Sequence, residues 1–154
     1  MLYRYRDPDA TTPRLAKGLS SEHPNPKAQG RLANELALKG MLDPGWAVLP
    51  LELVQWSGRP TLLLADPGGE PLEGLLGQSL GTGLFLRIAC ALAAALARLH
   101  AQGIVHKDIK PANVLVNLRT GAVHLMGFGI ATRPRRPTTS PAPWPTWPPS
   151  RPAA

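Results

Sequence analysis

A long helical pattern followed directly by a short polar loop between apolar segments constrains the fold most. Across residues 81–102, apolar side chains recur at the spacing of one helical face. They are Phe85, Ile88, Ala89, Leu92, Leu96 and Leu99. Gly103 stands where a glycine ends a helix, and apolar residues at 104–105 and 114–116 flank a polar loop. The sequence therefore predicts a loop held between a buried helix and short strands.

The residues ahead of this helix predict a small sheet with one further helix. Residues 2–17 alternate short patterns with proline-containing turns, as paired strands do, and residues 26–39 consist of strong helix formers. Two apolar runs, 47–54 and 61–65, predict a β-hairpin. The dense turn cluster at 66–71 is the expected junction between two sub-domains.

Charge and cysteine content exclude several classes of protein. The net charge is +7, but residues 131–154 hold four arginines and no acid, so the rest of the 154-residue chain has an ordinary mixed surface and no expected nucleic-acid partner. Cys90 is the only cysteine, so a disulfide framework is excluded and a cytoplasmic location is expected. The apolar stretch 84–99 contains Arg87 and Arg98 and is too short for a membrane span, so no membrane partner is expected.

The polar loop carries the chemistry. Residues 106–113 read His-Lys-Asp-Ile-Lys-Pro-Ala-Asn. This segment, between a long helix and a short strand, resembles the catalytic loop of bacterial serine/threonine protein kinases. The resemblance implies transfer of the ATP γ-phosphate to a Ser or Thr hydroxyl, with Asp108 as the base and Asn113 as a Mg²⁺ ligand. Lys110, next to a proline, matches the serine/threonine version of the loop and would lie near the transferred phosphate.

Two more site residues follow from the resemblance. Lys17 lies in a strand similar to the family's lysine strand, and Glu35 lies where the glutamate of the next helix would pair with that lysine. The pair would hold Lys17 toward the ATP phosphates. The turn cluster at 66–71 would be the hinge whose backbone holds adenine. The implied architecture is α+β and two-lobed: a partial N-lobe over residues 1–65 and a hinge with a partial C-lobe over residues 66–131.

The chain also departs from the family pattern. Gly127 replaces the Mg²⁺-binding aspartate of Asp-Phe-Gly, so metal binding is expected to be weakened or lost, and Lys107 replaces the usual arginine. A glycine-rich loop ahead of Lys17 and an Ala-Pro-Glu motif after Gly129 are both absent, which predicts an incomplete kinase fold. Eight prolines fall within the tail, residues 132–154, which is expected to be disordered or the product of a shifted reading frame.

Alternatives to an active kinase remain open at this point. A non-catalytic pseudokinase or interaction remnant is favoured by Gly127, whereas a small-molecule phosphotransferase is disfavoured by the Lys-Pro pair at 110–111. The amino-acid sequence around the loop also resembles the kinase domain of large fused sensor kinases. An incomplete C-lobe predicts self-association, or a missing C-terminal portion that covers Leu92, Leu96 and Leu99.

Overall fold

The structure, a computed structural model, describes residues 2–5, 13–19 and 25–134. The tail was predicted to be disordered, and its residues 135–154 lie outside the described part.

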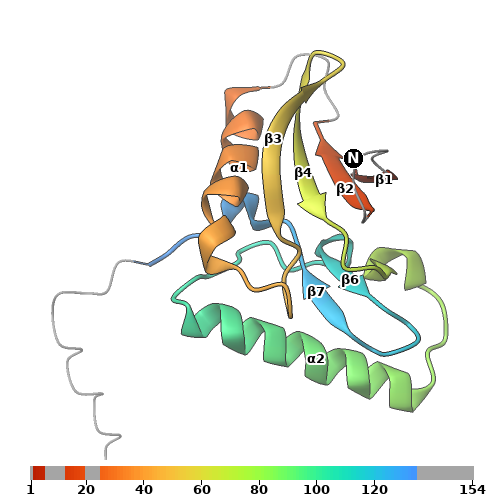
Figure 1. The fold of residues 1–154 in the computed structure, drawn as a ribbon. Coiled ribbons are helices and arrows are strands. Elements are labelled where there is room, and N and C mark those ends of the chain that lie inside the picture. Colours follow the sequence, from red (N-terminus) through yellow and green to blue (C-terminus); the bar gives the residue numbers. More distant parts are fainter. Residues whose placement is uncertain (1, 6–12, 20–24, 135–154) are drawn as a thin grey trace, which may run out of the picture.

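A four-stranded antiparallel sheet forms the upper part of the molecule (Figure 1). Its strands are β1 (Leu2–Tyr5), β2 (Arg14–Gly18), β3 (Pro50–Trp56) and β4 (Arg59–Ala65), in the order β1-β2-β4-β3. The pairing of the first two strands and the hairpin of the last two confirm the sequence predictions.

Helix α1 (Pro26–Ala37) lies along one face of this sheet (Figure 1). Its start is fixed because the Asn25 side chain accepts a hydrogen bond from the Lys27 amide. The helix buries Leu32 in an apolar core that also holds Leu62 and Leu64 of β4. It is two residues shorter than predicted, because the chain tightens into a 3₁₀ turn at Lys39–Met41.

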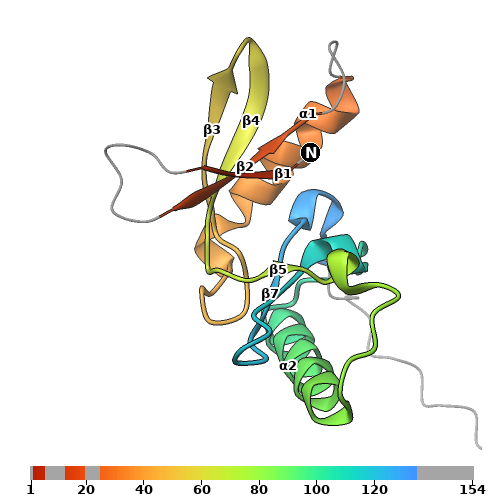
Figure 2. The ribbon, with the colours of Figure 1, turned by 90° about the vertical axis from the view of Figure 1, so that its right-hand side faces the viewer.

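The lower part consists of helix α2 (Thr82–Ala101) and a three-stranded sheet in the order β5-β6-β7. The strands are β5 (Glu70–Pro71), β6 (Val114–Val116) and β7 (Val123–Leu125). Figure 2 shows α2 and this sheet on the far side of the junction from β1–β4. The predicted glycine stop is confirmed: Gly103 has φ of 69°, and the amides of Gly103 and Ile104 bond the carbonyls of His100 and Leu99.

The two parts share buried side chains and backbone pairing. The segment before β3, predicted as strand from residue 47, instead runs beside β7, where the Val48 amide bonds the Leu125 carbonyl and the Leu125 amide bonds the Trp46 carbonyl. Leu115 of β6 and Met126 belong to the core under the upper sheet. The α+β architecture of an incomplete two-lobed fold is therefore confirmed, with its lobes packed directly on each other.

The predicted apolar face of α2 is partly wrong. Leu99 is fully buried and Ile88 is 5% exposed, but Phe85 is 57% exposed, so the covered face is rotated away from it. The side of α2 that carries Leu99 is therefore already covered by the described residues, and the side that carries Phe85 is the exposed one.

The length and the burial of α2 differ from those expected. The helix is longer than the stretch 84–99, and its length and its mean hydropathy of 1.6 over 18 residues are those of a candidate membrane span, features that the core helix of a soluble protein shares. It is also not a fully buried helix, since only 17% of that window is covered. One side packs on β6 and β7, and Figure 1 shows none of the other described elements across its lower side.

The chain stays packed slightly beyond the predicted domain end at residue 131. Thr132 and Val105 exchange two backbone hydrogen bonds of 2.8 and 3.0 Å, so Thr132 is still part of the folded body.

The rotated face of α2 predicts unequal effects of two truncations. Leu99→Ala should lower the free energy of unfolding by about 2–5 kcal/mol, because it opens a cavity in the core. Phe85→Ala should cost less than about 1 kcal/mol, because its ring is mostly in solvent. Urea unfolding of both variants measures this, and equal losses would contradict the observed orientation of the helix.

Candidate functional site

A cleft of about 430 Å³ opens between the upper sheet with α1 and the loops of the lower part. Five of the seven predicted site residues and replacements line it, all but Glu35 and Lys107: they are Lys17, Asp108, Lys110, Asn113 and Gly127. Glu35 lies behind the cleft wall and contacts two groups near it. A volume of this size is within the range of small-ligand sites.

Glu35 connects the strand, the helix and the segment after β7. Its side chain is 1% exposed, and its Oε2 accepts a hydrogen bond of 2.6 Å from the Lys17 Nζ. Its Oε1 accepts a bond of 3.1 Å from the Gly127 amide. A buried carboxylate requires such partners, because an unpaired buried charge is strongly unfavourable. The structure thus brings Lys17 and Glu35 together and holds the Lys17 ammonium at the cleft.

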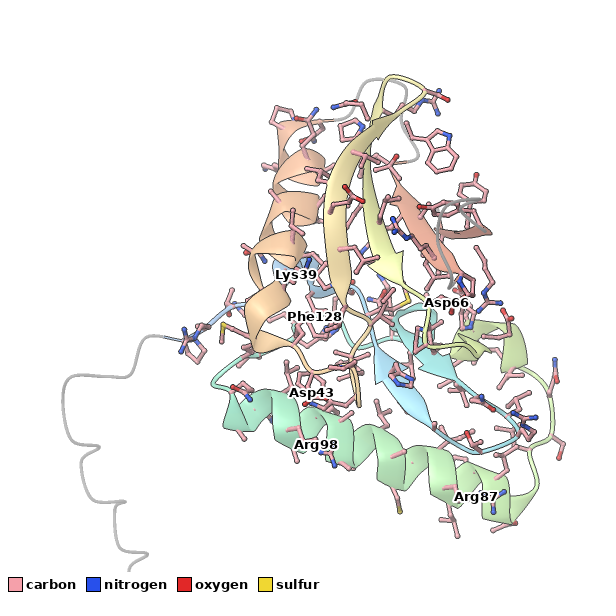
Figure 3. The ribbon with its side chains drawn as sticks, in the orientation of Figure 1. Lys39, Asp43, Asp66, Arg87, Arg98 and Phe128 are labelled. Carbon is pink, nitrogen blue, oxygen red and sulfur yellow. The ribbon has the colours of Figure 1, made fainter. Side chains whose placement is uncertain are left out.

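His106 supports the loop as a neutral side chain. Its Nε2 lies 3.0 Å from the Met126 carbonyl and its Nδ1 accepts a bond of 3.2 Å from the Asp108 amide, a pattern that only the neutral ring with a proton on Nε2 satisfies. Burial lowers its pKa, although the bond to the Met126 carbonyl acts in the opposite direction. The ring packs on Phe128 at 4.8 Å, and Figure 3 shows Phe128 in the interior beside α1.

Asp108 is held as a carboxylate at the mouth of the cleft. Its Oδ2 accepts a bond of 2.9 Å from Asn113 Nδ2 and lies 3.0 Å from Lys110 Nζ. Partial burial acts to raise its pKa, but the bonds from Lys110 and Asn113 outweigh it and hold the pKa below its usual range. The side chain is 36% exposed, so it is accessible to a ligand in the cleft.

Gly127 is the position where a carboxylate is missing, and the Asn113 side chain fills the space beside it. Its φ is 84°, a conformation that side-chain-bearing residues rarely adopt. A Cβ added there would lie 2.6 Å from the Asn113 side-chain oxygen. The space next to the glycine is therefore filled by the amide of Asn113.

The residues of the cleft do not fit a firmly held Mg²⁺. Magnesium prefers carboxylate and other oxygen ligands in octahedral geometry. The Asp108 carboxylate is engaged by Lys110 and Asn113, and Gly127 offers no side-chain ligand. Within the described residues no cluster of three His, Cys, Asp or Glu side chains is placed to bind a metal.

The predicted hinge is fixed by an arginine that sequence analysis did not single out. Arg4 of β1 donates to Glu70 Oε1 at 2.7 Å and to the Gly69 carbonyl at 2.6 Å, and it also pairs with Asp66. Figure 3 shows Asp66 at the end of β4, where the chain leaves the upper sheet. None of residues 66–71 lines the cleft described above.

Two residues of α1 were also missed. Asn34 donates to the carbonyls of Phe128, Gly129 and Ala131, at 3.1 to 3.2 Å, and so anchors the segment after Gly127. Arg31 lines the cleft. Helical spacing in the sequence could have identified Arg31 as a cleft residue, because it precedes Glu35 by four residues and lies on the same face of the helix.

The lowered histidine pKa predicts a pH dependence of stability. Above about pH 6.5 His106 is neutral in both states, whereas below it the unfolded chain binds a proton that the folded chain does not. As the pH is lowered below about 6.5, the free energy of unfolding should therefore decrease, by up to about 1.4 kcal/mol per pH unit for His106. Burial also lowers the pKa of His124, against a hydrogen bond with Pro44, so it adds to the same trend.

Urea unfolding at a series of pH values separates the two histidines. His106→Gln should flatten the slope as well as lowering stability, and His124→Gln serves as the comparison. An unchanged slope in His106→Gln would show that this histidine is protonated equally in both states.

The Lys17–Glu35 pair predicts a strong coupling. Lys17→Met should lower the free energy of unfolding by about 1–3 kcal/mol, because it leaves a buried carboxylate without its ionic partner. Adding Glu35→Gln should recover part of this loss. A double-mutant cycle of thermal or urea unfolding measures the coupling, and additive losses would contradict the pairing.

Comparisons with known proteins identify the family of the chain. A model described as the protein kinase domain matches residues 62–146, which extends beyond residue 131. The serine/threonine-protein kinase PknJ of Mycobacterium tuberculosis is 30% identical over 135 residues, covering 84% of this chain and 23% of the relative. The serine/threonine-protein kinase Pkn1 of Myxococcus xanthus is 37% identical over 76 residues, covering 47% of this chain and 11% of the relative. The chain thus spans less than a quarter of either relative, and it belongs to the serine/threonine protein kinase family.

Proposed function

We propose that this chain is a serine/threonine protein kinase domain whose phosphoryl transfer is impaired. The family uses ATP and Mg²⁺ to phosphorylate Ser or Thr hydroxyls. The proposal keeps the family's substrate class for the cleft and assigns the chain a turnover far below that of ordinary members.

The groups that position substrates are present in the cleft. The Asp108 carboxylate is exposed enough to orient a Ser or Thr hydroxyl and to accept its proton as the phosphate bond forms. Lys17, held by Glu35, and Lys110 supply positive charge for the phosphates. Lys110 also pairs with Asp108, which fits the serine/threonine type of loop better than a small-molecule phosphotransferase.

The observation that carries the impairment is Gly127 with Asn113 packed against it. A bound metal normally offsets much of the phosphate charge in the transition state, and here a carboxylate ligand is lacking where the family has one. A Cβ at residue 127 would clash with the end of the Asn113 side chain, so an aspartate there requires Asn113 to move from its bonds with Asp108. A fully non-catalytic pseudokinase is the second candidate, favoured by the same observation.

The test is transfer of radiolabelled phosphate from ATP to a generic Ser/Thr substrate by the full chain. Turnover should fall at least about a hundredfold below the roughly 1–100 s⁻¹ of typical kinases, with the residual activity lost in Asp108→Asn. Gly127→Asp should not raise it and should lower thermal stability. No Asp108-dependent transfer at all would favour the pseudokinase, and ordinary turnover would contradict the impairment.

A further inference from the structure

The charges around the cleft do not balance. Lys17 is neutralised by Glu35 at 2.6 Å, and Lys110 by Asp108 at 3.0 Å. Arg31 is the third cation on the cleft wall, and among the described residues its guanidinium has no hydrogen bond or ion pair. One positive charge is therefore left to face whatever occupies the cleft.

Arg31 is placed on a rigid element beside the missing carboxylate. It lies one turn before Glu35 on α1, and its Cβ would be 3.0 Å from a Cβ added at Gly129. The base of its side chain thus packs against the segment that follows Gly127. Its side chain is exposed, so the guanidinium can reach a ligand without opening the core.

We propose that the cleft binds a nucleoside triphosphate as the metal-free anion, with Arg31 supplying the charge that a bound metal supplies elsewhere. This rests on the proposed function, because it assumes that the cleft is the nucleotide site. An arginine guanidinium binds phosphate oxygens through two parallel hydrogen bonds. It can therefore bind a phosphate group without a metal ion between them.

A metal complex of the same nucleotide fits the cleft less well. Mg²⁺ would add positive charge next to Lys17, Arg31 and Lys110, and would reduce the negative charge on which these cations act. The carboxylates that could offset it are already paired. The free anion gains from the one unpaired cation, Arg31, and needs no carboxylate.

The test compares ATP binding by the full chain in EDTA and in excess Mg²⁺, by isothermal titration calorimetry. We expect tighter binding in EDTA. Arg31→Gln should raise Kd in EDTA by at least about tenfold, the effect of losing a charge-assisted pair with phosphate. Arg31→Lys, which keeps the charge, should lose less.

Arg119→Gln is the matched control, because Arg119 is an exposed arginine in the turn between β6 and β7 and does not line the cleft. It should leave binding unchanged in both conditions. Thermal unfolding of each variant checks that the fold persists.

Three other outcomes of the binding experiment would contradict the inference. Binding that requires Mg²⁺ would overturn this inference and leave the proposed function intact. Binding in EDTA that Arg31→Gln does not weaken would also overturn it. No binding of ATP in either condition would remove both the inference and the nucleotide site on which it depends.

Discussion

The structure depends on how it satisfies one buried carboxylate. Glu35 is 1% exposed and bonds the Lys17 ammonium on one side and the Gly127 amide on the other. An uncompensated charge at such a depth costs several kcal/mol, so strand β2, helix α1 and the segment after β7 must meet at this point. This contact joins the two lobes at the cleft, together with the bonds of Asn34 to the segment after Gly127, and it places Lys17.

From Gly127 the constraint passes to the catalytic loop through short contacts. The Met126 carbonyl accepts from His106, whose other nitrogen holds the Asp108 amide, and Asn113 bonds both the backbone and the carboxylate of Asp108. Asn113 also occupies the space that a side chain at Gly127 would need. The glycine is therefore built into the packing of the loop, and the absence of the carboxylate affects the shape of the site as well as its charge.

The sequence predicted those residues whose chemistry requires a fixed spacing. The loop at 106–113 was recognisable because its polar groups must converge between a helix and a strand, and Gly103 because a helix end needs a positive φ. Phe85 was misplaced because α2 is apolar on more than one side, so periodicity does not say which side is covered. Arg4 and Arg31 were missed because an arginine that contacts a distant segment looks, in sequence, like any solvated side chain.

Holding a nucleotide and transferring its phosphate make different demands on this cleft. Binding needs positive charge and donors, and Lys17, Lys110 and Arg31 lie on the cleft wall. Transfer also needs charge on the phosphoryl oxygens to be offset as it redistributes in the transition state, which is where a carboxylate-held metal contributes most. A glycine at 127 removes a group that serves transfer while leaving the cations that serve binding in place. Affinity for nucleotide and rate of transfer are therefore separable properties of this fold, and a loss of one does not imply a loss of the other.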